Sequence, residues 1–133
     1  MALTRAFRLV FHEPDFEGIR INGCTDRGIA EQIFTSHGIE DSAENWNRFR
    51  DEYLRHLPET LADRQGQVLP GVGDLLDTLA DQSQLHLGVL TGNTEGGAQQ
   101  KLAYFGLQKY FHFGAYGDEH PDRADIARSA LAE

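Results

Sequence analysis

The chain has 133 residues, enough for one ordinary domain or two small lobes, and its 40% hydrophobic content is enough for a packed core. The formal net charge of −9, with basic residues scattered among acidic ones, excludes a nucleic-acid-binding surface. The single cysteine, Cys24, excludes an internal disulfide, and we expect it to be an inert thiol. No apolar run approaches the ~20 residues of a membrane span. We therefore expect a cytoplasmic protein that contacts neither nucleic acid nor membrane.

The first part of the chain carries helical patterns only. An apolar stripe over residues 3–11 predicts an opening helix that ends at Pro14. A second helix is predicted to begin at a cap formed by Thr25 or Asp26 and to stop at Gly38. Both helices present an apolar face, so they are expected to pack together.

A third, longer helix is predicted after Ser42, which is a favourable N-cap residue. Its apolar positions recur every three or four residues: Trp46, Phe49, Tyr53, Leu57 and Leu61. Pro58 lies inside this run, which predicts a kink or a break near Leu57. The helical pattern lapses between residues 63 and 70, and we place a hinge there. The sequence thus predicts a helical lobe over 1–66 and a second lobe over 67–133.

The second lobe alternates between helix and strand patterns. The predicted elements are a helix at 72–79, a buried strand at 85–91, a helix at 94–105, a strand at 110–116 and a helix at 125–132. This order favours an α/β fold, because parallel strands are joined through helices.

The end of the first predicted strand is the strongest indication of chemistry. Thr91, Gly92 and Asn93 form a tight turn between the strand and the following helix. A hydroxyl and the free amides of such a turn, at a helix N-terminus, can all point at one phosphate. Ligands of open α/β sheets bind at this carboxyl edge of the strands.

Several motifs resemble the haloacid dehalogenase-like superfamily of hydrolases, and its phosphoglycolate-phosphatase-like members in particular. Val89–Asn93 is similar to the family's second motif, whose Thr or Ser holds the transferring phosphoryl group. Leu69–Val72 resembles the return of the chain from the cap into the core. Phe105–Leu107, followed by Tyr110 and Phe111, resembles the approach to the third core strand, and Gly23–Asp26 the start of the second cap helix.

The resemblance implies a partial, Rossmann-like parallel core with an all-helical cap. It also implies Mg²⁺-dependent hydrolysis of a small phosphorylated metabolite such as phosphoglycolate. Arg123 matches the position of the family's third-motif cation. The alternative is a solvated residue at the start of the last helix. The resemblance places Thr25 and Asp26 toward the active site, where they would select the substrate. Simple N-capping explains the same two residues.

The departures from the family concern the attacking group and the metal. Members carry an Asp-x-Asp motif at the end of their first strand and acidic Mg²⁺ ligands after a later one. The 133 residues contain no Asp-x-Asp. We therefore expect a fragment that lacks the first and last family strands and is inactive as given. Asp118 and Asp122 imitate the metal-binding motif, but their spacing from Thr91 favours a charged loop before the last helix. A lone loop histidine, His120, is expected to be neither ligand nor base.

Three further expectations remain open. A strand pair without the family's first strand exposes an apolar edge, which predicts a homo-oligomer or a complementing segment as partner. An alternative function is a non-catalytic remnant that binds phosphate-bearing ligands or a protein, and a plain helical interaction module is a third possibility. Dehalogenation of small acids, also a family chemistry, fits less well than phosphate ester hydrolysis.

Overall fold

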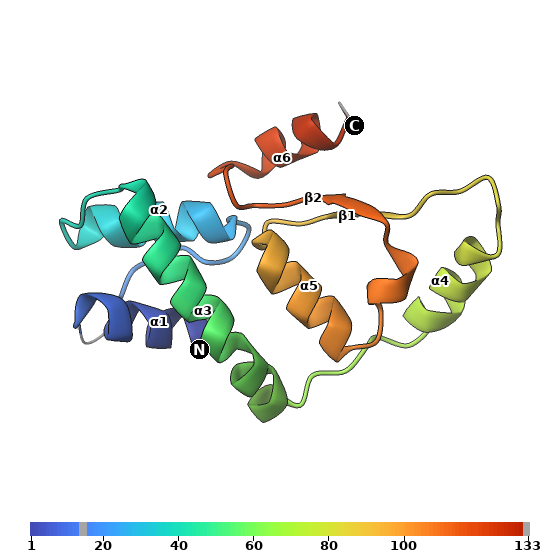
Figure 1. Ribbon diagram of the computed structural model, residues 1–133, viewed down its shortest axis with the longest axis horizontal. Coiled ribbons are helices and arrows are strands. Elements are labelled where there is room, and N and C mark those ends of the chain that lie inside the picture. The colour runs from blue at the N-terminus through green and yellow to red at the C-terminus, as the bar shows by residue number, and fades with distance from the viewer. Residues whose placement is uncertain (14–15, 132–133) are drawn as a thin grey trace.

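The computed structural model describes residues 1–13 and 16–131. It consists of a helical part and a small α/β part, joined by the segment after residue 64 (Figure 1). The mixed α/β class is the one predicted from the sequence. No helix within the described residues is long and apolar enough to span a membrane.

The helical part contains α1 (Ala2–Phe11), α2 (Asp26–Ser36) and α3 (Ala43–Arg64). Its interior is the main hydrophobic core of the described chain, and the side chains of Phe7, Ile33, Phe34 and Phe49 are fully buried there. The rings of Phe34 and Phe49 meet edge to face with centroids 5.8 Å apart. The apolar faces predicted from the sequence therefore build this core.

Local signals set most helix ends as predicted. Thr25 caps α2, and Ser42 caps α3 by accepting the amide of Asn45 at 3.2 Å. Helix α1 ends at Phe11, and His12 takes the left-handed conformation. The predicted stop at Pro14 lies outside the described residues.

Of the kink or break predicted near Leu57, the break is wrong, because α3 runs without interruption from Ala43 to Arg64 with Pro58 inside it. A proline in a helix removes the amide that would bond the carbonyl four residues earlier, here that of Leu54. The side-chain amide of Gln100 on α5 donates to this carbonyl at 3.1 Å. A partner from another helix thus satisfies the carbonyl that the proline leaves unpaired.

The α/β part contains α4 (Val72–Ala80), β1 (Gly88–Leu90), α5 (Glu95–Tyr104), a 3₁₀ turn η1 (Gln108–Tyr110), β2 (Phe113–Ala115) and α6 (Arg123–Ala130). The two strands are parallel and pair Gly88 with Phe113 and Leu90 with Ala115. Helices α5 and α6 lie on opposite sides of the strand pair (Figure 1). Helix α3 packs along α5 and so connects the two parts.

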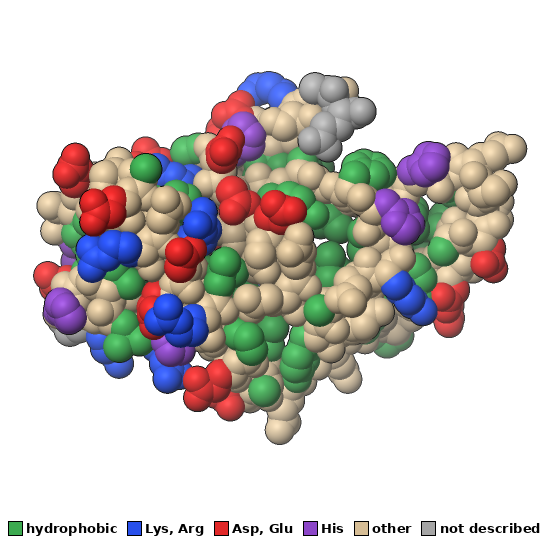
Figure 2. Space-filling model, viewed as in Figure 1, with side chains coloured by type: hydrophobic (Ala, Val, Ile, Leu, Met, Phe, Trp, Pro, Cys, Tyr) green, Lys and Arg blue, Asp and Glu red, His purple; other side chains and the backbone are tan. Residues whose placement is uncertain are grey.

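Both strands are shorter than predicted, and the expectation of a buried first strand is wrong. Leu85 is 48% exposed, Leu90 58% and Phe113 48%. Within the described residues the sheet has only two strands, so β1 has a free edge, and its residues are exposed or half-buried. Hydrophobic side chains are accordingly open to solvent along the middle of the molecule, while charged side chains gather over the helical part (Figure 2).

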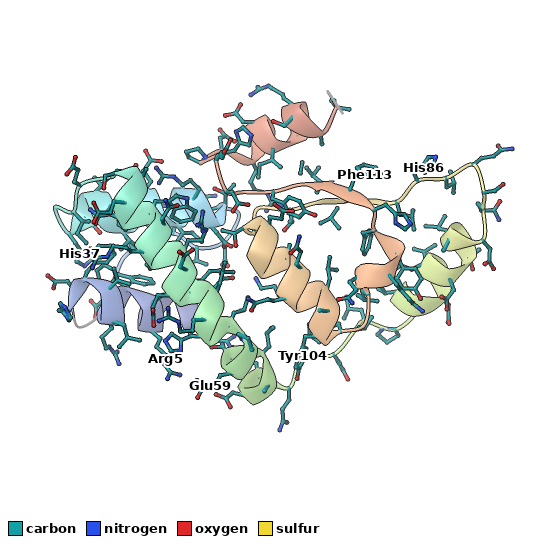
Figure 3. All side chains as sticks on the ribbon, viewed as in Figure 1. Arg5, His37, Glu59, His86, Tyr104 and Phe113 are labelled. Carbon is teal, nitrogen blue, oxygen red and sulfur yellow. The ribbon has the colours of Figure 1, made fainter. Side chains whose placement is uncertain are left out.

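Surface ion pairs add little to this arrangement. Arg5 on α1 and Glu59 on α3 pair at 2.5 Å, at the lower edge of the helical part (Figure 3). Both side chains are about half exposed or more, so the pair is worth about 0–1 kcal/mol at most. The buried aromatic core, and not surface charge, holds the three helices together.

Candidate anion-binding site

The predicted corner directly follows β1. The amide of Thr91 donates to the carbonyl of Ala115 at 3.1 Å and thus continues the strand ladder by one residue. The hydroxyl oxygen of Thr91 accepts two hydrogen bonds from Asn93, one from its backbone amide at 3.2 Å and one from its side-chain Nδ2 at 2.6 Å. The turn is therefore held by its own side chains.

The amides around the corner are less free than the sequence suggested. The Asn93 amide is engaged by Thr91, and the Thr94 amide donates to Asp26 Oδ2 at 2.8 Å. The next amide, that of Glu95, donates to Asp118 Oδ2 at 2.5 Å. The structure gives no hydrogen bond from the amide of Gly92 to another described residue. The Gly92 amide and the Thr91 hydroxyl are thus the donors that the corner offers to an anion.

Asp26 fastens the helical part to this corner. Its backbone amide donates to the Gly92 carbonyl at 2.7 Å, and its carboxylate holds the start of α5 through Thr94. Burial raises the pKa of Asp26, and nearby Asp118 raises it further, while the Thr94 amide and the Lys101 ammonium act in the opposite direction. The net direction is upward because the loss of hydration outweighs these favourable contacts.

Thr25 makes a second fastening between the two parts. Its hydroxyl is fully buried, accepts the Gly28 amide at 2.9 Å as the N-cap of α2, and donates to the Pro121 carbonyl at 3.1 Å. The contact with Gly28 is the N-capping interaction that the sequence suggested. A role of Thr25 or Asp26 in choosing a substrate stays a prediction.

A cavity of about 370 Å³ opens beside the corner, between the helical part and α5. Its polar lining includes Asp26, Asn93, Lys101 and Tyr53, and apolar side chains of α1 and α3 form much of the remaining wall. Burial, and then the Asp26 charge, raise the pKa of the Tyr53 hydroxyl, so Tyr53 stays protonated. Of the three corner residues, Asn93 lines this cavity, whereas Thr91 and Gly92 do not. The cavity is large enough for a small organic ligand.

Lys101 is a cationic residue of this cavity that hydrogen-bonds a corner residue. Its ammonium group donates to Asn93 Oδ1. Burial lowers the pKa of Lys101, and the Asp26 carboxylate raises it in part. Sequence reasoning missed this residue, although its spacing contained a signal. Lys101 lies seven residues, two helical turns, after the N-cap Thr94, so both lie on one face of α5.

Arg123, the predicted cation, is the first residue of α6, and its side chain is exposed. It is not among the residues that line the cavity beside Asn93. The last helix begins two residues earlier than predicted, because the Asp122 side chain caps it by accepting the Ala124 amide at 2.8 Å. The role of Arg123 in binding the phosphoryl group therefore stays a prediction.

The acidic residues near the chain's second strand are used as helix caps. Asp118 binds the start of α5, and Asp122 binds the start of α6. His120 Nε2 lies 3.1 Å from the hydroxyl of Ser129. Within residues 1–13 and 16–131, no cluster of three or more His, Cys, Asp or Glu side chains is arranged to hold a metal ion. The residues present therefore do not fit the Mg²⁺ site that the resemblance implied.

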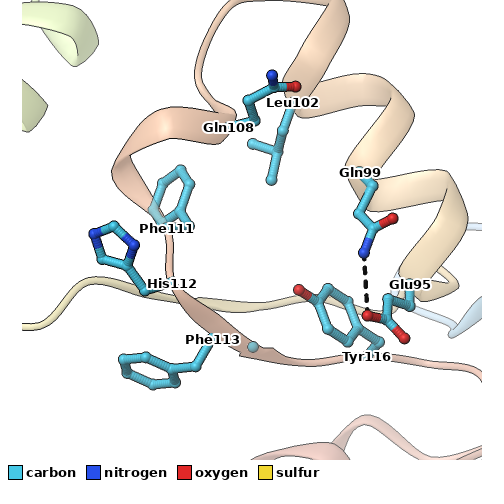
Figure 4. A pocket seen from close by; sticks show the side chains of 9 residues that line it. Glu95, Gln99, Leu102, Gln108, Phe111, His112, Phe113 and Tyr116 are labelled. Atoms are coloured by element: carbon cyan, nitrogen blue, oxygen red, sulfur yellow. Dashed lines mark hydrogen bonds between the residues drawn. The ribbon is translucent and has the colours of Figure 1, made fainter.

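A larger cavity, of about 550 Å³, lies between α5 and β2 (Figure 4). Its wall includes Glu95, Gln99, Phe111 and Tyr116, and Gln99 donates to Glu95 at 3.1 Å. None of the residues predicted from the sequence to bind phosphate lines it. Size alone therefore does not identify the site in this chain, and the corner at residues 91–93 remains the better candidate.

Comparison with known proteins supports the interpretation of these motifs. A family model described as haloacid dehalogenase-like hydrolase matches residues 5–131, nearly the whole chain. A search of curated proteins gives no significant match.

Proposed function

This chain belongs to the haloacid dehalogenase-like hydrolases, and from this membership we propose that its corner at Thr91–Asn93 binds the phosphoryl group of a small phosphorylated metabolite. Phosphoglycolate is one example of such a metabolite. The Thr91 hydroxyl and the Gly92 amide are the donors, and Arg123 is the proposed additional cation. The metabolite's organic group would occupy the 370 Å³ cavity next to Asn93.

One observation carries this proposal. The Thr91 hydroxyl oxygen receives two hydrogen bonds, and Gly92 has an amide with no acceptor among the described residues. Two donors at the carboxyl end of a parallel strand, before a helix N-terminus, suit an oxyanion. This arrangement binds an anion but contains no group that attacks phosphorus.

We infer that the 133 residues by themselves hydrolyse phosphate esters negligibly. Aspartyl phosphoryl transfer requires a nucleophilic carboxylate and a metal ion to neutralise the phosphate oxygens. The sequence has no Asp-x-Asp motif, and the nearest carboxylates, Asp26 and Asp118, are held by backbone amides of α5. The corner can therefore hold a phosphoryl group, while the groups that would transfer it are missing from the described residues.

Replacing Thr91 by valine tests the proposed grip. The change keeps the branched shape and removes the hydroxyl, so we expect phosphate or vanadate to bind more weakly by about 1–3 kcal/mol, about 5- to 150-fold. Isothermal titration calorimetry measures the change. Thr78→Val is the matched control, because Thr78 lies on the remote helix α4 and bonds only its own helix backbone. Unchanged affinity in Thr91→Val would remove Thr91 from the site.

We also propose a second function, a non-catalytic module that binds phosphate-bearing ligands or a protein, because the strand pair exposes apolar side chains. Leu90 of β1 and Phe113 of β2 are exposed and offer an apolar contact surface for a protein. The two functions differ in one measurement. A peptide with a hydrophobic strand ending in Asp-x-Asp, added with Mg²⁺, restores phosphatase activity only if the corner belongs to a catalytic site.

A further inference from the structure

The side-chain amide of Asn93 lies between Lys101 and Thr91. Lys101 donates to Asn93 Oδ1, and Asn93 Nδ2 donates to the Thr91 hydroxyl oxygen at 2.6 Å. An ammonium group has three donors and no acceptor, so only the oxygen of the amide can face it. Lys101 therefore fixes which end of the Asn93 amide points at Thr91.

This orientation decides what the Thr91 hydroxyl can do. Its oxygen has two lone pairs, and the two hydrogen bonds from Asn93 use both. The hydroxyl proton has no acceptor among the described residues. It is thus the one hydrogen-bonding group of Thr91's side chain that is left for a ligand, and it can only donate.

We propose that Lys101 is a positioning residue, which holds Asn93 in the orientation that makes the Thr91 hydroxyl an obligatory donor to a bound anion. This inference rests on the proposed function, because it presumes that the anion binds at Thr91. Without Lys101, the Asn93 amide can turn over and present Oδ1 to Thr91. The hydroxyl proton then bonds Asn93, and the corner loses a donor.

The surroundings of Lys101 agree with a fixed ammonium group. The residue comes from the last turn of α5 and is partly buried in the cavity wall. Asp26, Tyr53 and Arg64 are the other titratable or charged side chains around that cavity, apart from the thiol of Cys24 and the chain's amino-terminal residue. Burial lowers the pKa of Lys101, and the carboxylate of Asp26, the acidic side chain of this cavity, raises it in part.

A double-mutant cycle between Lys101→Met and Thr91→Val separates positioning from simple charge attraction. Inorganic phosphate binding is measured by calorimetry in the four proteins. We expect Lys101→Met to weaken binding roughly tenfold when Thr91 is present, and less than about twofold in the Thr91→Val background. Lys101→Arg keeps donors without acceptors, so its affinity is expected to stay close to that of the unmodified protein.

An equal loss in both backgrounds would overturn the inference, because a direct attraction between Lys101 and the anion does not depend on Thr91. No loss in Lys101→Met would overturn it as well. If Thr91→Val binds phosphate unchanged, or the unmodified protein does not bind it, the proposed function fails instead. A second measurement, which needs no bound phosphate, then tests whether Lys101 positions Asn93.

That readout is the Asn93 side-chain amide in NMR spectra of the unliganded protein. The proposal expects cross-relaxation between the Asn93 NH₂ protons and the Thr91 side chain, which persists in Lys101→Arg and disappears in Lys101→Met. Circular dichroism of each variant confirms that it is folded. Persistence of the contact in Lys101→Met would show that Asn93 is held without the lysine, and would refute the proposal.

Discussion

Replacement of Asp26 tests the contact on which the candidate site depends. Asp26→Ala leaves the Thr94 amide without its acceptor, and Thr94 is fully buried. An orphaned buried amide costs about 1–3 kcal/mol of stability. Asp26→Asn keeps an oxygen that accepts this hydrogen bond and removes only the charge. We therefore expect Asp26→Ala to be less stable than Asp26→Asn by about 1–3 kcal/mol.

The dependence on pH separates the charge from the hydrogen bond. Burial raises the pKa of Asp26 above its ordinary value of 3.8, so the folded protein holds this proton more tightly than the unfolded chain does. Ionised Asp26 therefore lowers the free energy of unfolding. This loss of stability is absent at pH values below the pKa of the unfolded chain and complete above the raised pKa of the folded protein. The stability of the unmodified protein relative to Asp26→Asn should fall as the pH rises through this interval.

Urea denaturation followed by the fluorescence of Trp46, the single tryptophan, measures both effects. Trp46 lies on α3 and packs against the core of the helical part. Equal stability of Asp26→Ala and Asp26→Asn would refute the assigned hydrogen bond. A stability difference between the unmodified protein and Asp26→Asn that does not change with pH would refute the raised pKa.

Three more predictions concern packing. Gly117→Ala places a Cβ 2.2 Å from the Gly92 carbonyl oxygen, so thermal unfolding should show a loss of stability of at least about 1–3 kcal/mol. The control Gly73→Ala lies in open space on α4 and should gain about 0.5–1 kcal/mol of stability. Phe34→Ala should cost about 3–5 kcal/mol in the same assay, since its ring is fully buried in the core. The free edge of β1 should lead the chain to self-associate, so sedimentation velocity should find species above 14.9 kDa that Leu90→Lys reduces. A monomer at all concentrations would contradict that expectation.

Much of the fold follows from local signals in the sequence. Ser42 caps its helix, and apolar residues at helical spacing, such as Phe34 and Phe49, form the core of the helical part. The order of helix and strand patterns indicated parallel pairing, which the register confirms. Such signals are readable because caps and periodic faces depend on residues close together in the chain.

The contacts around the corner depended on residues far apart in the sequence. Asp26 reaches Thr94 across 68 positions, and Gln100 compensates for Pro58 by reaching Leu54 on another helix. The exposure of Leu90 likewise depends on what lies beside β1 and not on its own hydrophobicity. No periodicity predicts which remote carboxylate occupies a helix N-terminus.

The sequence by itself thus determined the helices, the parallel strand pair and the Thr-Gly-Asn turn, because each is specified by neighbouring side chains and backbone preferences. Only the tertiary structure decided which donors of that turn remain free, because packing brings the carboxylates of Asp26 and Asp118 to it from other parts of the chain. A buried donor must find a partner when water is excluded. The partner it finds is fixed by packing, and packing depends on the whole fold.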